Sequence, residues 1–329
     1  MKMKSLLIGM ALAAPLMFQS SVHAAVDKLT LKLAHNLDQE HVVHKAIAQM
    51  AEEVQKESGG KMRIRIYPNG QMGGPRETLE MIQAGGLDMT KASASEMEPF
   101  ASAFSVFSLP YLFNDEAHFK KVLYGPVGRS IMQETAPQGF TPIAAYVAGN
   151  RSFYTKKPVH SPEDMKGMKI RVVSTPTTNR IIELLGASPA PIPFGEVYTA
   201  LQQGVIDGAE NNEPSYYQTR HLEVAKYFTE DQHTSVPDYL IISKPVWDKM
   251  SDEQRAIFTK AAHNSELYQQ KLWDEEVANS RKKAQEMGVT FITVDKEPFR
   301  QALRPLYDDF RKDKNVASWI EQIESAGKQ

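Results

Sequence analysis

The stretch from residue 29 to residue 66 reads LTLKLAHNLDQEHVVHKAIAQMAEEVQKESGGKMRIRI and decides the fold class. Residues 29–34 alternate leucine with polar residues, which is typical of a β-strand. Apolar residues then recur at helical spacing until Gly59-Gly60, and a second alternating run follows over residues 62–66. A strand, a helix and a second strand in this order predict a mostly parallel α/β sheet with helices on its faces.

The same alternation of strand and helix patterns continues along the chain. Gly74-Pro75 is typical of a helix start, and Gly85-Gly86 is typical of its end. Further strands are predicted over residues 87–93, 140–146, 152–155, 169–172 and 205–209, and further helices begin near residues 161, 177 and 195. Because the pattern occurs in two halves with different residues, we expect two similar lobes.

One predicted helix is much longer than the others. Ser251 and Gln254 form a capping-box pattern, and no glycine or proline follows until Gly288. A helix of about 37 residues would be about 55 Å long, which is more than one small lobe needs. We expect it to cross both lobes.

Length, charge and composition exclude several classes of protein. The chain has 329 residues, a formal net charge of −2, 42% hydrophobic residues, 24% charged residues and no cysteine. This length allows two domains with a sizeable core. The near-neutral charge argues against nucleic acid as a partner. The lack of cysteine excludes a disulfide framework, a cysteine nucleophile and thiolate metal sites.

The first 24 residues have the features of a secretory signal peptide. Lys2 and Lys4 precede an apolar run over residues 6–18, and Val22 and Ala24 occupy the small positions before a cleavage site. The apolar run is shorter than the roughly 20 residues that a membrane span needs. We expect cleavage and export of a soluble protein, with an uncleaved anchor as the alternative.

Motifs of the common enzyme classes are absent from the chain, which has no dinucleotide-binding, P-loop, nucleophile-elbow or zincin pattern. His41 and His44, with His35 nearby, have a spacing that can hold zinc, but we expect surface histidines. Glu96 and Glu98 could form an acid pair, but we expect them to be exposed. These observations predict a protein that is not an enzyme and has no cofactor and no metal.

Cationic and amide residues stand where predicted strands begin or end. They are Lys91, Arg151, Arg171 and the pair Asn211-Asn212. Ligands of open α/β sheets bind beyond the carboxyl ends of strands, and arginine is the natural partner of a carboxylate. Arg171 is the best candidate because it interrupts an apolar strand. The alternative for each arginine is a structural ion pair, and for Lys91 a solvated lysine.

Five ordered segments resemble the substrate-binding proteins of tripartite ATP-independent periplasmic (TRAP) transporters, of the DctP type. The resemblance extends from Leu29 to about Phe310. The segments are YPNGQMG (67–73), LPYLF (109–113), DMKGMKIRV (164–172), PFGEVYTALQ (193–202) and DGAEN (207–211).

The resemblance implies a type II-like periplasmic binding protein fold with two lobes, mixed sheets flanked by helices and a long helix spanning both lobes. After a signal peptide over residues 1–24, we expect residues 25–148 plus about 237–276 to form lobe I. Residues 149–236 plus about 277–329 are expected to form lobe II and the C-terminal helices. The ligand would bind between the lobes, which close over it.

The resemblance also implies the roles of individual residues. The arginine of the Lys-Ile-Arg-Val motif, here Arg171, would form a salt bridge with the substrate carboxylate. Arg151 would supply a second cationic contact, and Asn211 would hydrogen-bond the same part of the ligand. Phe194 would pack on the ligand, and Asn36 would contact it from the other lobe.

Other positions concern the identity of the ligand. Ser93 stands where some relatives place an acidic ligand contact, which argues against sialic acid. Residues 149–154 and 210–216 resemble the branch that takes up sugar acids, although Glu213 departs from its pattern. Lys91 adds a charge that a hydroxy acid or a second carboxylate could use. We expect a hexuronate such as glucuronate or galacturonate, or an aldonate. The alternatives are a C4-dicarboxylate or other small carboxylate, and an enzyme on the same fold.

The resemblance implies partners as well. The closed, ligand-bound form would be recognised by the small and large membrane subunits of a TRAP transporter in a Gram-negative envelope. A monomer is expected, and delivery of ligand to a chemoreceptor is an alternative that would use the same binding site.

Overall fold

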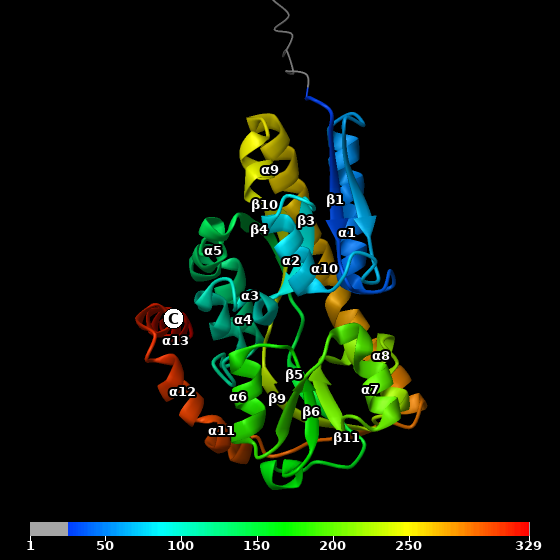
Figure 1. The fold of residues 1–329 in the computed structure, drawn as a ribbon, viewed down its shortest axis with the longest axis vertical. Coiled ribbons are helices and arrows are strands. Elements are labelled where there is room, and N and C mark those ends of the chain that lie inside the picture. The colour runs from blue at the N-terminus through cyan, green and yellow to red at the C-terminus, as the bar shows by residue number, and fades with distance from the viewer. Residues whose placement is uncertain (1–25, 329) are drawn as a thin grey trace, which may run out of the picture.

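The computed structural model describes residues 26–328, and it contains two β-sheets with helices around each (Figure 1). The expected signal peptide, residues 1–24, lies outside the described residues. In the first sheet the strand order is β2-β1-β3-β10-β4. Its strands are β1 (Leu29–Ala34), β2 (Met62–Tyr67), β3 (Met89–Ser93), β4 (Phe140–Tyr146) and β10 (Asp238–Ser243).

The second sheet has the strand order β11-β9-β5-β8-β6-β7. Its strands are β5 (Arg151–Thr155), β6 (Lys169–Val172), β7 (Ser188–Pro191), β8 (Gly208–Asn211), β9 (Tyr227–Thr234) and β11 (Thr290–Ile292). The strand expected over residues 205–209 is displaced to 208–211, because Gly204 ends the preceding helix in a left-handed conformation and a turn follows it.

Both sheets are mixed, which confirms the expected fold class. Strand β1 is parallel to β2 and β3, as the βαβαβ pattern predicts. Strand β10 enters the first sheet from the second one and therefore runs antiparallel to both of its neighbours. The short segments 147–150 and 235–237 link the sheets, so each lobe is built from separate parts of the chain.

Helices cover the two sheets in Figure 1, with the first sheet in the upper part of the view and the second in the lower part. Those beside the first sheet are α1 (Val42–Glu57), α2 (Pro75–Gln83), α3 (Ala94–Met97), α4 (Glu116–Tyr124), α5 (Pro126–Gln133) and α9 (Lys244–Lys249). Those beside the second are α6 (Pro176–Leu184), α7 (Val197–Gln203), α8 (Glu213–Gln218) and α11 (Glu297–Leu303).

Shorter and later helices complete the fold. The 3₁₀ helices are η1 (Ser102–Ser108), η2 (Ala136–Gln138), η3 (Pro162–Met165), η4 (Phe194–Glu196) and η5 (His221–Glu223). The last two α-helices are α12 (Pro305–Phe310) and α13 (Lys314–Ala326), and α13 packs against η1, α4 and α5. The expected division placed residues 277–329 with the second lobe. That division stays a prediction, although α13 packs on elements of the range expected to form the first.

The long helix α10 (Asp252–Glu286) has 35 residues and is capped as predicted, with the side chains of Ser251 and Gln254 each accepting the other's backbone N–H. It packs against α1 and β4 of the first lobe and against α8 of the second. It therefore spans both lobes, which confirms the expectation from its length. Within the described part of the chain, no helix combines the length and the apolar composition that a membrane span requires.

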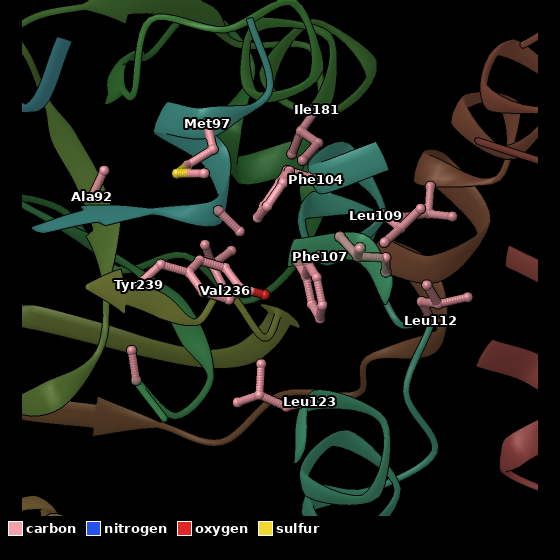
Figure 2. Close-up of a cluster of buried hydrophobic side chains, with 14 of the residues drawn as sticks. Ala92, Met97, Phe104, Phe107, Leu109, Leu112, Leu123, Ile181, Val236 and Tyr239 are labelled. Atoms are coloured by element: carbon pink, nitrogen blue, oxygen red, sulfur yellow. The ribbon is translucent and has the colours of Figure 1, made fainter. Parts of the chain in front are cut away.

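One apolar cluster contains buried residues from elements that pack on both sheets, and Figure 2 shows a part of it. Tyr239 of β10 meets the ring of Phe104 of η1 edge to face, with 5.2 Å between the ring centroids. Ile181 of α6 belongs to the same cluster and lies close to Phe104 in Figure 2. Aromatic rings contribute large buried areas, so this cluster holds η1 against both sheets.

A glycine in the link between β4 and β5 is a sensitive position. Gly149 has a φ of +60°, and an added Cβ would lie 3.2 Å from the Trp273 ring of α10. We expect Gly149→Ala to lower the free energy of unfolding by about 2 kcal/mol, because alanine is strained in the left-handed region and the tryptophan must also move. Urea denaturation followed by circular dichroism measures this change.

Gly139→Ala is the matched control for this substitution. Gly139 also has a positive φ, +85°, but an added Cβ would meet no atom within 4 Å. It should cost only the conformational part, about 1 kcal/mol. Equal losses in the two variants would contradict the role given to the contact with Trp273.

Candidate binding site between the two sheets

The sites expected from the sequence come together at facing edges of the two sheets. Strands β1, β3, β6 and β8 end at these edges, and the antiparallel strands β5 and β10 begin there. One cavity, here called the inner pocket, is lined by all seven predicted site residues: Asn36, Lys91, Ser93, Arg151, Arg171, Phe194 and Asn211. Their roles as ligand contacts stay a prediction, but their convergence is a property of the fold.

Arg171 is a buried cation without a counter-charge. It lies on β6 and is only 4% exposed, and its neighbours Ile170 and Val172 are buried as well. Its Nε–H donates to the carbonyl oxygen of Ile192 at 2.8 Å, and its guanidinium lies over the Phe194 ring at 5.6 Å from the centroid. Among residues 26–328, no carboxylate oxygen lies within 4.0 Å of it. Burial lowers the pKa of Arg171, as expected for a charge that lacks compensation.

Arg151, by contrast, is neutralised inside the protein. Its Nε and Nη2 donate to the two carboxylate oxygens of Glu210, the second at 2.8 Å, and its Nη1 donates to Asn211 Oδ1 at 3.1 Å. Burial alone would lower the pKa of Arg151, but the charge and hydrogen bonds of Glu210 raise it overall. The sequence pattern did not identify Glu210 as a partner, and the pair forms because β5 and β8 are neighbours.

His233 and Asp231 form a second buried pair next to Glu210. His233 Nδ1 lies 2.7 Å from Asp231 Oδ2, and the His233 ring stacks on Phe153. Burial would lower the pKa of His233, but Asp231 and then Glu210 raise it to about 9. Burial would likewise raise the pKa of Glu210, but Arg151 and His233 lower it to about 2. The two cations and two anions of this network therefore compensate each other.

Lys91 is paired as well, with a residue that the sequence analysis did not single out. Its Nζ lies 2.7 Å from Asp238 Oδ1, and both side chains are nearly buried. Lys91 is only 5% exposed, so the alternative of a solvated lysine is wrong. Asp238 begins β10 and also lines the inner pocket. No sequence motif marks it, because it reaches the site through strand pairing.

The remaining polar residues offer hydrogen-bonding groups to an occupant. Asn36 Oδ1 is buried without a hydrogen-bond partner among the described residues. Ser93 caps α3, where its hydroxyl and backbone N–H both donate to Glu96 Oε2, at 2.8 and 2.7 Å. Asn211 Oδ1 accepts from the backbone N–H of Asn212 at 2.9 Å as well as from Arg151.

Two expectations about charged residues near this site are corrected. His35 and His41 are buried, not surface histidines, and burial lowers the pKa of each to about 3. His35 directly follows β1 and His41 is the N-cap residue of α1, and their burial depends on packing that the local sequence does not reveal. Glu96 and Glu98 are both half-buried, not exposed. Glu98 Oε1 accepts from the hydroxyl of Thr177 at 2.7 Å, and Glu96 Oε2 accepts from the hydroxyl of Ser93. Within residues 26–328, no three or more His, Asp or Glu side chains are grouped so that they could hold a metal ion.

A larger cavity, here called the outer pocket, adjoins the inner one. It has a volume of about 640 Å³ and shares Asn36, Glu96, Arg171, Val173 and Phe194 with the inner pocket. It extends between the start of α2 and the segment that precedes α7. Arg171 therefore stands where the two cavities meet.

The structure combines two linked sheets with a cavity between them, and among residues 26–328 the buried cation Arg171 in this cavity has no carboxylate partner. The chain belongs to the bacterial extracellular solute-binding proteins of family 7, DctP, whose family model matches residues 33–313. This match and the relatives below confirm the resemblance to TRAP solute-binding proteins that the sequence motifs indicated.

Three solved structures illustrate the similarity. A TRAP periplasmic solute-binding protein from Xanthobacter autotrophicus Py2, with bound β-D-galacturonate, is 39% identical over 90% of this chain and 99% of its own, with a TM-score of 0.88. A protein from a Bradyrhizobium species, in complex with α/β-D-galacturonate, has 38% identity, the same two coverages and a TM-score of 0.88. A protein from Anaerococcus prevotii, with bound α/β-D-glucuronate, is 37% identical over 92% of this chain and 99% of its own, with a TM-score of 0.89.

The buried histidine makes stability depend on pH. The pKa of His233 is about 9 in the folded chain and about 6.5 in the unfolded chain. The folded chain therefore binds more protons in this window, and the stability that the charged histidine contributes is lost as the pH rises from about 6.5 through 9. We expect the wild type to lose on the order of 1–3 kcal/mol there, measured by urea denaturation at several pH values.

His233→Gln should show a flatter profile over the same window, because glutamine does not titrate. His160→Gln, at an exposed histidine, is the control and should keep the slope of the wild type. A slope that survives in His233→Gln would show that another group titrates.

Proposed function

We propose that this protein captures a hexuronate in the periplasm and presents it to the membrane subunits of a TRAP transporter. The observation that carries the proposal is the pairing of the cations that line the inner pocket, where the remaining carboxylate, Glu96, accepts hydrogen bonds from Ser93. Of the three cations that line it, Arg151 is paired with Glu210, Lys91 is paired with Asp238, and Arg171 alone lacks a carboxylate partner. One uncompensated cation fits a ligand with one carboxylate.

The same pairing argues against a C4-dicarboxylate. A second ligand carboxylate would need a second free cation, and near Lys91 it would be repelled by Asp238. A hydroxyl group both donates and accepts hydrogen bonds, so a sugar ring can satisfy paired cations and anions together. The bound galacturonate and glucuronate of the similar structures are ligands of this kind.

Binding follows from the position of Arg171 at the junction of the pockets. The ligand carboxylate would accept hydrogen bonds from the free Nη atoms of the guanidinium, while Phe194 covers one face of that group. Asn36 and Asn211 would hydrogen-bond the hydroxyls. Closure of the lobes would expel water and strengthen each charged contact.

Partners and cellular place are part of the proposal. Family membership supports a solute-binding role outside the cytoplasm, and the amino-terminal pattern of the sequence fits export. Recognition of the closed form by the small and large membrane subunits, and uptake driven by an ion gradient, complete the proposed transport step. We propose no catalytic step. Recovery of unchanged D-glucuronate after incubation with the protein, checked by mass spectrometry, tests this point.

Ligand class is tested first by thermal shift and calorimetry. D-Galacturonate and D-glucuronate should raise the melting temperature, because a ligand stabilises the folded form that binds it. Succinate and malate should not raise it at equal concentrations. Stabilisation by the dicarboxylates alone would contradict the proposed ligand class.

Arg171→Ala tests the anchor itself. The variant should lose at least about 3 kcal/mol of binding free energy for the uronate, the scale of breaking a desolvated ion pair. Isothermal titration calorimetry measures the loss. Arg180→Ala, which removes a half-exposed guanidinium from α6, is the control and should bind like the wild type. Near wild-type affinity in Arg171→Ala would remove the basis of the proposal.

A further inference from the structure

We propose that Asp238, held by Lys91, is a specificity-determining residue that binds a hydroxyl of the ligand from the first lobe. This inference rests on the proposed uronate function and deepens it. It gives a buried ion pair of the first sheet a role in ligand selection, and it assigns the site of the carboxylate and the site of this hydroxyl to different lobes.

Strand pairing places the two side chains side by side. In the antiparallel pair of β10 and β3, Asp238 is opposite Ser93 and Leu240 is opposite Lys91. Lys91 and Asp238 are therefore diagonal neighbours on one face of the sheet, where long side chains can meet. Their atoms Nζ and Oδ1 lie 2.7 Å apart, and both residues line the inner pocket.

The pair has unused hydrogen-bonding capacity that faces this pocket. Among residues 26–328, the Lys91 ammonium, which carries three donors, has one ion-pair contact, to Asp238 Oδ1. A carboxylate can accept several hydrogen bonds, and the contact to Lys91 is the one contact of the Asp238 carboxylate recorded within residues 26–328. Burying two charges costs free energy unless further hydrogen bonds compensate it, so an occupant that supplies them is favoured.

A hydroxyl group is the chemistry that fits this pair. It can donate to the Asp238 carboxylate and accept from the Lys91 ammonium in the same position. An anionic group would be repelled by the aspartate, and an apolar group would leave the charges without partners. The pair therefore selects for hydroxyls, while Arg171 selects for the carboxylate.

The residue proposed to bind the carboxylate and the residues proposed to bind the hydroxyl belong to different sheets. Arg171 belongs to β6 of the second sheet, whereas Lys91 and Asp238 belong to β3 and β10 of the first. A ligand with only a carboxylate can satisfy the second lobe alone. A ligand that also carries the right hydroxyl contacts both lobes, and it gains affinity for the closed arrangement in which both contacts form.

The test measures the affinity for each ligand in the wild type and in a variant without the Asp238 carboxylate. Isothermal titration calorimetry is run on the wild type and on Asp238→Asn with D-glucuronate and with glucuronates that each lack one ring hydroxyl. In the wild type we expect one deoxy compound to bind at least about tenfold more weakly than D-glucuronate. The missing hydroxyl leaves a buried charged group without a hydrogen-bond partner. In Asp238→Asn that compound and D-glucuronate should bind with similar affinities.

Asp248→Asn is the matched control, because Asp248 forms an exposed pair with Lys244 at the same distance of 2.7 Å, far from the pocket. It should keep the wild-type pattern. If Asp238→Asn does not fold, as judged by circular dichroism, Lys91→Gln is used and the same loss of discrimination is expected.

Two outcomes overturn the inference in distinguishable ways. If the variant weakens D-glucuronate and every deoxy compound by the same factor, the ion pair is purely structural, and the proposed uronate function stands. If the wild type binds no uronate, the proposed function fails, and this inference fails with it.

Discussion

The buried guanidinium of Arg171 is the constraint on which the site depends. A charge removed from water is costly unless another charge or several hydrogen bonds compensate it. The protein gives Arg171 one backbone carbonyl and the face of Phe194, but no carboxylate within ion-pair distance among the described residues. In the proposed function, the carboxylate of the ligand supplies the partner that the described residues do not.

The charges around Arg171 bear on which ligand the proposed function favours. Arg151 with Glu210, and Lys91 with Asp238, are closed pairs that add dipoles to the cavity without adding net charge. His233 lies between Asp231 and Glu210, and it forms ion pairs with both carboxylates. Such an arrangement favours one carboxylate among several hydroxyls, because hydroxyls can bond to both members of each pair.

The charged residues of the site belong to two sheets that are connected at several points. The links 147–150 and 235–237, the helix α10 and the apolar cluster around Phe104 connect the lobes, while the pockets lie between the two sheets. In one of these links, Gly149 lies close enough to Trp273 of α10 that an added Cβ would be 3.2 Å from its ring. Interactions near the links are therefore able to affect how the lobes meet over a ligand.

The sequence by itself determined the features that depend on neighbouring residues. These are the strand pattern of β1, the capping of α10 by Ser251, and the position of an arginine within the Lys-Ile-Arg-Val strand. The tertiary structure alone decided which charges are compensated. Asp238 reaches Lys91, and Glu210 reaches Arg151, through the register of strands far apart in the chain. Burial of His35 and His41 was decided in the same way. Pair energies and burial depend on distances across a folded sheet, and no local pattern of residues contains those distances.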